Sequence, residues 1–193
     1  MIGGDNMDVN VKFAKVRPNA IIPSKRDEDM GFDIYACFEE NYILINPHET
    51  KLSPTGLASA CDPGYGFLVF ERGSTGSKGI ARRCGVIDSG YRNEWFIGLT
   101  NTTEYALYIS KLTKEELMKL DYASVKNLFG DAACCYPELD EYWYDAIVYP
   151  YSKAIAQALV IPVPNVNREE ISYEDLKTIP SDRGLGALGS SGK

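Results

Sequence analysis

The feature that most constrains the fold of this chain is a set of short apolar stretches, each a few residues long, that turn-forming residues separate. From Val9 to Phe13 the apolar residues alternate with Asn10 and Lys12, which is the pattern of a strand with one buried face. Further strands are expected over residues 42–45, 67–70, 95–99 and 158–163. Glycine, proline and asparagine residues divide these stretches. The pattern predicts an all-β fold, either an antiparallel barrel or a sandwich.

One block, from Lys111 to Asp145, breaks the strand pattern. Thr113 followed by Glu116 has the spacing of a capping box, with leucines at the flanking staple positions 112 and 117. A second short helix is expected over 124–129, ending at Gly130. The block holds four lysines against eight acidic residues, a net charge of −4, and ends in the aromatic run 142–144. Two interpretations stay open: a helical lid that packs on the β-domain, or a surface that binds a protein partner.

The composition excludes several kinds of chemistry. Because His48 is the single histidine, a Ser-His-Asp mechanism or a multi-histidine zinc site would depend on one turn residue. The five cysteines are odd in number and form no C-x-x-C pair, which indicates a reducing compartment, the cytoplasm, rather than a disulfide framework or a zinc ribbon. The formal net charge of −7 disfavours nucleic-acid binding through a broad basic face. The sequence contains no apolar run of about 18 residues, the length that predicts a membrane span. Residues 1–10 do not resemble a signal peptide.

Five separated segments stand out along the chain, and the second of them has residues that suit a phosphate-bearing ligand. The first two are M-G-F-D-I-Y-A at 30–36 and R-G-S-T-G-S-K-G at 72–79. In the second, a guanidinium lies beside flexible backbone and hydroxyl donors, as phosphate oxygens require. The other three are G-V-I-D-S-G-Y-R at 85–92, I-A-Q at 155–157 and R-G-L-G-A-L-G-S-S-G at 183–192.

In this order the five segments resemble the motifs of the trimeric dUTPase family, and the block between the third and fourth resembles the insertion of its phage- and Firmicute-like members. The family hydrolyses dUTP to dUMP and pyrophosphate, which keeps uracil out of DNA. The resemblance implies a jelly-roll-like β-barrel (residues 1–110 and 146–180), a helical insertion (111–145) and a mobile C-terminal arm (181–193). It also implies a homotrimer in which each active site draws on three chains.

The third motif implies the roles of the catalytic residues. By resemblance, Asp88 holds and deprotonates the attacking water, and Asp33 helps to organise the waters around Mg2+. The ion itself would be held by the triphosphate and water, with no direct protein ligand. Tyr91 would pack under the deoxyribose and exclude a ribose 2′-hydroxyl. Backbone groups of the hairpin would read uracil: Gly85, Val86 and Ile87.

The remaining motifs imply contacts to the phosphate chain and to the closed nucleotide. The phosphate contacts are expected from Arg72, Gly73, Ser74, Thr75 and Gln157. In the arm, Arg183 would bind the γ-phosphate, and further contacts are expected from Gly184, Leu188, Gly189, Ser190 and Ser191. The chain departs from the family pattern in three motifs. Gly73 replaces a serine, Ser152-Lys153-Ala154 replaces the G-D-R before I-A-Q, and Leu188 replaces the phenylalanine that covers the uracil ring.

Two alternative functions compete with this interpretation. A dCTP deaminase, or a bifunctional deaminase of the same fold, activates water with a glutamate that follows a serine- and arginine-rich segment. That pattern is missing from this sequence, and Tyr91 favours the hydrolase. The other alternative is a regulatory binding module that acts through residues 111–145.

Overall fold

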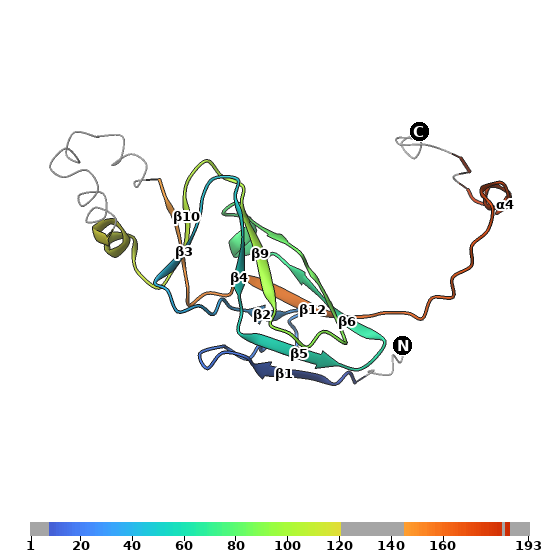
Figure 1. The fold of residues 1–193 in the computed structure, drawn as a ribbon, viewed down its shortest axis with the longest axis horizontal. Coiled ribbons are helices and arrows are strands. Elements are labelled where there is room, and N and C mark those ends of the chain that lie inside the picture. The colour runs from blue at the N-terminus through green and yellow to red at the C-terminus, as the bar shows by residue number, and fades with distance from the viewer. Residues whose placement is uncertain (1–7, 121–144, 183, 186–193) are drawn as a thin grey trace. The chain divides into compact units, whose positions relative to one another are not determined.

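The computed structural model describes residues 8–120, 145–182, 184 and 185, and the structural statements below concern these residues. The chain divides into two compact units, Met1–Val163 and Pro164–Lys193. The first unit contains twelve described strands, paired in four sheets (Figure 1). The all-β prediction is therefore confirmed for this unit. Within the described residues, none of the helices has the length and apolar character needed to cross a membrane.

The largest sheet has the strand order β2-β12-β6-β8, and each neighbouring pair is antiparallel. Its strands are β2 (Phe32–Ile34), β12 (Ala156–Pro162), β6 (Tyr65–Phe70) and β8 (Val86–Asp88). Strand β12 pairs with β2 near its start and with β6 along most of its length. This register places two of the predicted motifs, around Asp33 and around Gln157, directly opposite each other.

The three smaller sheets complete the unit. One joins β4 (Thr50–Pro54), β9 (Phe96–Asn101) and β7 (Ile80–Arg83), and another pairs β1 (Val11–Lys15) with β5 (Leu57–Cys61). The third has the order β11 (Ile147–Pro150), β10 (Leu107–Ser110) and β3 (Tyr42–Ile45). Among the described strand pairs, β10 and β11 alone are parallel.

The sheets enclose one main hydrophobic core. At its centre Trp95 is fully buried, and its indole N–H donates to the Ser59 hydroxyl at 3.1 Å. The rings of Phe67 and Phe13 meet the indole edge-on, with centroids 5.0 and 6.0 Å away. Full burial of a side chain such as that of Phe67, which is 1% exposed, stabilises the fold by about 1.5–3 kcal/mol. The aromatic contacts therefore join strands β1 and β6 to the segment that leads into β9.

The first helix of the insertion forms as predicted. Residues 114–120 are helical, the Thr113 amide donates to the Glu116 carboxylate at 2.8 Å, and the Glu116 amide donates to the Thr113 hydroxyl at 3.2 Å. Leu112 and Leu117 pack with Tyr108 in a second apolar cluster. This confirms the capping box and shows that the start of the insertion packs on strand β10, as a lid would.

The parallel pairing of β10 and β11 gives the insertion a topological role. Parallel neighbours need a crossover connection of a dozen or more residues, and residues 111–146 are the segment that joins the two strands. Several predicted features lie outside the described residues: the helix at 124–129, Gly130, Cys134, Cys135 and the aromatic run 142–144.

The strand predictions differ in accuracy along the chain. The stretch 42–45 matches β3, and the other four predicted stretches overlap β1, β6, β9 and β12. The sequence analysis did not predict seven strands (β2, β4, β5, β7, β8, β10, β11), each of which has three to five residues. The expected barrel continues to residue 180, whereas its last strand ends at Pro162 and a helix, α4 (Tyr173–Thr178), lies in the second unit. Ser172 caps that helix by accepting from the Asp175 amide.

Candidate active site

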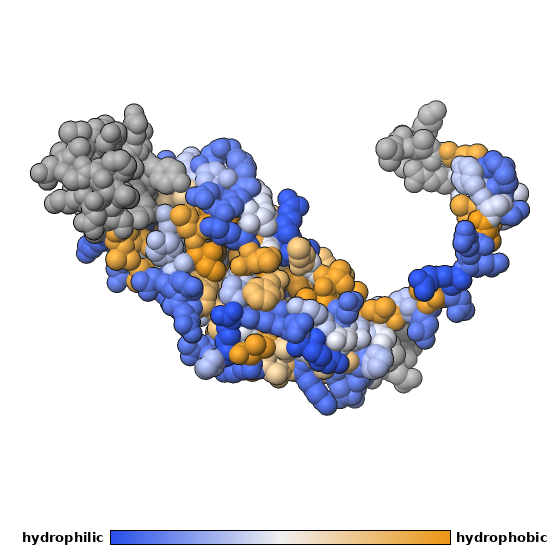
Figure 2. All heavy atoms as spheres, in the orientation of Figure 1, coloured by the Kyte–Doolittle hydropathy of each residue, from blue (hydrophilic) through white to orange (hydrophobic). Residues whose placement is uncertain are grey.

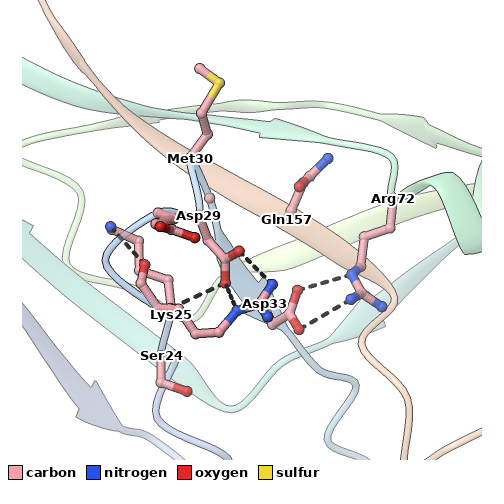
Figure 3. Close-up of a pocket in the computed structure, with 10 residues that line it drawn as sticks. Ser24, Lys25, Asp29, Met30, Asp33, Arg72 and Gln157 are labelled. Carbon is pink, nitrogen blue, oxygen red and sulfur yellow. Dashed lines mark hydrogen bonds and ion pairs between the residues drawn. The ribbon is translucent and has the colours of Figure 1, made fainter.

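A pocket of about 610 Å³ lies where β2, β12 and the loop after β6 meet (Figure 3). Asp33 and Arg72 face each other in it, with Nε and Oδ1 2.9 Å apart and Nη2 and Oδ2 3.2 Å apart. Both side chains are about one-third exposed, at 35% and 31%. Gln157 pairs with Asp33 on β2 and with Phe70 at the end of β6. Strand β12 therefore brings the first, second and fourth motifs together where its own start meets the end of β6.

The second motif folds as a single helical turn, α1 (Gly73–Gly76). The Arg72 amide donates to the Thr75 hydroxyl at 3.0 Å, and that hydroxyl donates back to the Arg72 carbonyl at 3.0 Å. Thr75 is only 1% exposed, so its side chain shapes the turn that presents Arg72. The Ser74 hydroxyl is exposed and lies 3.4 Å from Arg72 Nη1. A Cβ added to Gly73 would meet no atom within 4 Å.

Gln157 is held in the pocket by a backbone contact. Its side-chain amide donates to the Glu71 carbonyl at 2.8 Å. The Glu71 carboxylate in turn accepts from the Arg82 amide at 3.0 Å, and this backbone hydrogen bond is the main cause that lowers the pKa of Glu71. Gln157 thus joins β12 to the residue that directly precedes Arg72.

A loop closes the other side of the pocket, and of its residues only Met30 and Gly31 belong to a predicted motif, the first. It contributes Ser24, Lys25, Arg26, Glu28, Asp29, Met30 and Gly31. Arg26 binds Asp29 through Nη2 and Oδ1 at 2.8 Å and through Nε and Oδ2 at 3.0 Å, and these bonds lower the pKa of Asp29 to about 2. The run K-R-D-E-D at 25–29 was the available sequence signal.

Lys25 differs from the other two cations of this pocket. Arg26 and Arg72 each bind a carboxylate. The Lys25 ammonium donates to the Arg26 carbonyl at 3.3 Å, and no described carboxylate lies within ion-pair distance of it. Lys25 is therefore the pocket cation that is available to an incoming anion.

The third motif forms a hairpin-like turn on β8, with Asp88 exposed at its tip. Asp88 pairs with Gly66 on β6, and its carbonyl accepts from the Tyr91 amide at 3.0 Å. Arg92 donates to the Ser59 carbonyl at 3.2 Å and to two carbonyls of the turn itself. The hairpin lines a separate pocket of about 140 Å³ together with the start of β6. Asp88 and Tyr91 are therefore presented on a turn that its own backbone contacts hold.

Gly85 is required where β8 begins. A Cβ at this position would lie 2.8 Å from the Val69 carbonyl oxygen, closer than such atoms approach. The Gly85 carbonyl accepts from the Val69 amide at 2.7 Å. The close approach of two backbones fixes the start of the hairpin, where Val86 and Ile87 follow.

The two pockets lie at opposite ends of β6. Asp88 is opposite Gly66 at the start of the strand, and Arg72 follows its last residue, Phe70. Gly66 and Phe70 are four positions apart on β6, which at about 3.3 Å per residue corresponds to about 13 Å, and Arg72 lies two positions beyond the end of the strand. The structure therefore brings together Asp33, Arg72, Ser74 and Gln157, and places Asp88, Val86 and Tyr91 elsewhere on the same chain.

The predicted arm is described only in part. Gly184 has a φ of 55°, in the region that favours glycine, and its amide donates to the Ser181 carbonyl at 3.1 Å. The other arm residues of the prediction lie outside the described residues: Arg183, Leu188, Gly189, Ser190 and Ser191. No group of three or more described His, Cys, Asp or Glu residues is arranged to hold a metal ion.

Comparison with known proteins agrees with these features. A family model for dUTPases matches residues 17–114, just over half of the 193 residues. The deoxyuridine 5′-triphosphate nucleotidohydrolase of Paraburkholderia xenovorans (strain LB400) is 28% identical over 192 residues, which cover 97% of this chain and 99% of that protein. The protein of the same name from Leptospira interrogans serovar copenhageni is 34% identical over 99 residues, 49% of this chain and 68% of that protein.

Two solved structures share the fold. A mutant dUTPase of Staphylococcus bacteriophage 80alpha with dUpNHpp has a TM-score of 0.64 at 18% identity, and the match covers 95% of this chain and 99% of that chain. The dUTPase from phage phi11 of S. aureus, solved to show its species-specific insert, has a TM-score of 0.57 at 17% identity and covers 84% and 96%. The predicted jelly-roll-like fold is confirmed by these likenesses.

Proposed function

The chain belongs to the dUTPase family, and from this premise we propose that it hydrolyses dUTP to dUMP and pyrophosphate with the help of Mg2+. The observation that carries the proposal is the complete third motif, which presents Asp88 and Tyr91 on one exposed turn. The pocket of Asp33, Arg72 and Gln157 supplies the second part, because a bidentate guanidinium is suited to phosphate oxygens.

The distance between the two pockets supports a site shared between chains. A catalytic group must lie about 3–3.5 Å from the reacting atom, whereas Asp88 and Arg72 of one chain are separated by most of strand β6. We therefore propose a homotrimer in which the hairpin of one protomer faces the Asp33–Arg72 pocket of a second, while a third supplies the arm. Hydrophobic residues gather on the visible face of the first unit (Figure 2). Exposed apolar residues of this unit include Leu52 (60%) and Phe96 (40%), which give it surface to bury in such an assembly.

The residues divide the reaction between them. Asp88 accepts a hydrogen bond from water and takes its proton as the water oxygen bonds to the α-phosphorus. The bond from that phosphorus to the α,β-bridging oxygen breaks, and pyrophosphate leaves with the electron pair. Arg72 and Lys25 stabilise charge on the phosphate oxygens, since phosphoryl transfer depends mainly on positioning and electrostatics. Tyr91 lies under the sugar and leaves no space for a 2′-hydroxyl.

The pocket fits a hydrated Mg2+ rather than a metal bound in a protein cage. Mg2+ prefers oxygen ligands and keeps several waters, and the pocket offers the carboxylates of Glu28, Asp29 and Asp33. Asp29 and Asp33 are already bound by arginines, so we expect Asp33 to hold a metal-bound water rather than the ion. When bound with the nucleotide, Mg2+ would neutralise charge on the β- and γ-phosphate oxygens.

A substrate panel tests the proposed activity. Purified protein is incubated with dUTP, UTP, dTTP or dCTP, with and without Mg2+, and pyrophosphate and ammonia are measured. We expect pyrophosphate from dUTP alone, dependent on Mg2+. Release of ammonia from dCTP would instead identify the deaminase alternative, and the absence of any product from dUTP would refute the proposal.

We also propose that the insertion binds a protein partner in addition to catalysis. The block at 111–145 is acidic and ends in aromatic residues, a composition that suits an interface. Relatives from phage 80alpha are described as controlling transfer of virulence genes by a proto-oncogenic G protein-like mechanism.

Because residues 111–146 connect parallel strands, a test must keep that connection. Replacing 121–144 with a Gly/Ser linker of equal length, while the packed helix 114–120 stays, should abolish partner capture and preserve dUTP hydrolysis. Loss of folding would favour the lid interpretation.

The cysteines support a cytoplasmic location, which remains our proposal. Cys37, Cys61 and Cys84 are free thiols. Burial is the main cause that raises the pKa of Cys61, and a thiol of raised pKa is less reactive at neutral pH. A structural role of this cysteine suits a reducing compartment.

A further inference from the structure

Glu94 lies two residues beyond the third motif and is the centre of a network that no predicted role explains. Its side chain is only 11% exposed. The Arg17 guanidinium binds its carboxylate in bidentate fashion, through Nε and Oε1 at 2.7 Å and through Nη2 and Oε2 at 3.1 Å. The Gly56 amide also donates to Oε1, at 2.8 Å. The Glu94 carboxylate therefore ties together the loops after β1 and before β5.

The partners of Glu94 are themselves fixed. Gly56 has a φ of 68°, and a Cβ there would lie 2.7 Å from the Ala20 side chain, so no other residue fits the position. Its carbonyl accepts from the Val16 amide at 2.7 Å. On the other side, the Trp95 amide donates to the Leu57 carbonyl at 2.8 Å. The backbone at residues 94 and 95 is thus held from two directions.

This fixed backbone holds the ring of Tyr91. The Tyr91 hydroxyl donates to the Glu94 carbonyl at 3.0 Å, while the Tyr91 amide donates to the Asp88 carbonyl at 3.0 Å. The two bonds fix the phenol at one end and the backbone at the other. Movement of Glu94 would therefore move the phenol relative to the turn that carries Asp88.

We propose that the Arg17–Glu94 ion pair is a positioning device that sets the place of the Tyr91 ring and thereby the discrimination between deoxyribose and ribose. The inference rests on the proposed function, in which this ring occupies the space of a 2′-hydroxyl. Steric exclusion of the 2′-hydroxyl depends on its distance from the Tyr91 ring, so a small displacement of the ring opens space for that hydroxyl. Glu94 and Arg17 contact no substrate and act through Tyr91.

The ratio of kcat/KM for dUTP to kcat/KM for UTP distinguishes a role of the Arg17–Glu94 pair in positioning Tyr91 from a role in protein stability alone. Glu94→Ala and Arg17→Ala should each lower this ratio about tenfold, since displacement on the order of 1 Å can change rates on the order of 100-fold. Arg17→Lys keeps the charge but loses the bidentate geometry, and its ratio should be intermediate. In the double variant the two effects should not add, because both remove the same interaction.

Glu104→Ala is the matched control, because the exposed Glu104 carboxylate lies 3.0 Å from His48 Nε2 and takes no part in the hydrogen bonds described for Tyr91 and Arg92. Its ratio should equal that of the wild type. If Glu94→Ala does not fold, Arg17→Ala tests the same pair from the more exposed partner. An unchanged ratio in a folded variant of either residue overturns the inference while the proposed function stands. A wild-type protein that hydrolyses no dUTP would refute the proposed function itself.

Discussion

The Arg72 guanidinium binds the Asp33 carboxylate through two nitrogens, with Nε at 2.9 Å from Oδ1 and Nη2 at 3.2 Å from Oδ2. The pair joins the loop after β6 to strand β2, although the two residues are 39 positions apart in the sequence. Because both side chains are partly exposed, the pair itself contributes about 1 kcal/mol or less to stability. The two contacts with Asp33 fix the plane of the Arg72 guanidinium.

Replacement of Asp88 by asparagine should abolish turnover and leave binding intact. Asparagine keeps the size of the side chain but cannot accept a proton from water, so kcat should fall on the order of 100- to 10,000-fold. The affinity for a nonhydrolysable dUTP analogue should stay within about twofold of the wild-type value, within the scatter of ordinary surface substitutions. Asp62→Asn, which lies outside both pockets and contacts Asn10, is the control for the substitution. Near-normal kcat in Asp88→Asn would remove this residue from the mechanism.

Lys25→Ala should raise KM for dUTP with a smaller effect on kcat. The lost interaction is a charge contact to phosphate, which is commonly worth roughly 1.5–3 kcal/mol, so KM should rise roughly 10- to 150-fold. The salt dependence of KM should also weaken, because exposed charge contacts are screened by salt. Lys12→Ala removes an exposed lysine from β1, outside both pockets, and should change neither quantity. Equal KM values for Lys25→Ala and the wild type would exclude Lys25 from the phosphate site.

The Arg26–Asp29 pair predicts a defined response to acid. Its hydrogen bonds lower the pKa of Asp29 from 3.8 to about 2, so the folded state favours the charged carboxylate. The contribution of the pair is therefore complete above about pH 4 and is lost as the pH falls through about 2. Titration of the Asp29 carboxyl carbon by NMR should give this low pKa in the wild type. In Arg26→Ala the pKa should be higher but still below 3.8, because the amide of residue 26 continues to donate to Asp29 Oδ2. The same pKa in both proteins would show that the Arg26 guanidinium is not the cause.

Two glycines of the site should respond oppositely to substitution. At Gly73 an added Cβ meets nothing within 4 Å, so Gly73→Ser should leave the melting temperature unchanged. Its hydroxyl, which the family pattern carries here, should lower KM for dUTP. At Gly85 a Cβ would lie 2.8 Å from the Val69 carbonyl oxygen, and Gly85→Ala should cost about 1–3 kcal/mol through the strain of overpacking. Thermal unfolding and dUTP kinetics of both variants check the pair. Equal melting temperatures of the two variants would contradict the prediction that a side chain fits at position 73 but clashes at position 85.

Local signals in the sequence predicted local structure well. The capping box of Thr113 and Glu116 depends on residues three positions apart, and it forms as expected. The stretch 42–45 matches β3 because four consecutive apolar residues end at a turn. The cap of α4 at Ser172 was also local but was missed, because the C-terminal segment was interpreted as barrel and arm.

Long-range relationships could not be predicted from the sequence. Glu94 meets Arg17 across 77 positions and Gly56 across 38, and no periodic pattern connects such residues. Thr75 was expected to contact the substrate, but its side chain is buried in the turn after Arg72. The sequence alone does not show this burial. The loop at 24–29 joins the pocket because β12 pairs with β2 on one side and with β6 on the other. Such pairing of strands that are distant in the sequence has no local signal.

Complementation between two inactive variants tests the shared active site most directly. The Asp88→Asn and Arg72→Ala proteins are refolded together at equal concentration, and dUTP hydrolysis is compared with that of each variant alone. If Asp88 of one protomer works with Arg72 of another, random assortment should restore about a quarter of the sites, each with an intact Asp88 and an intact Arg72 from different chains. If the mixed trimers form and no activity returns, both residues act within one chain, and the proposed arrangement is contradicted.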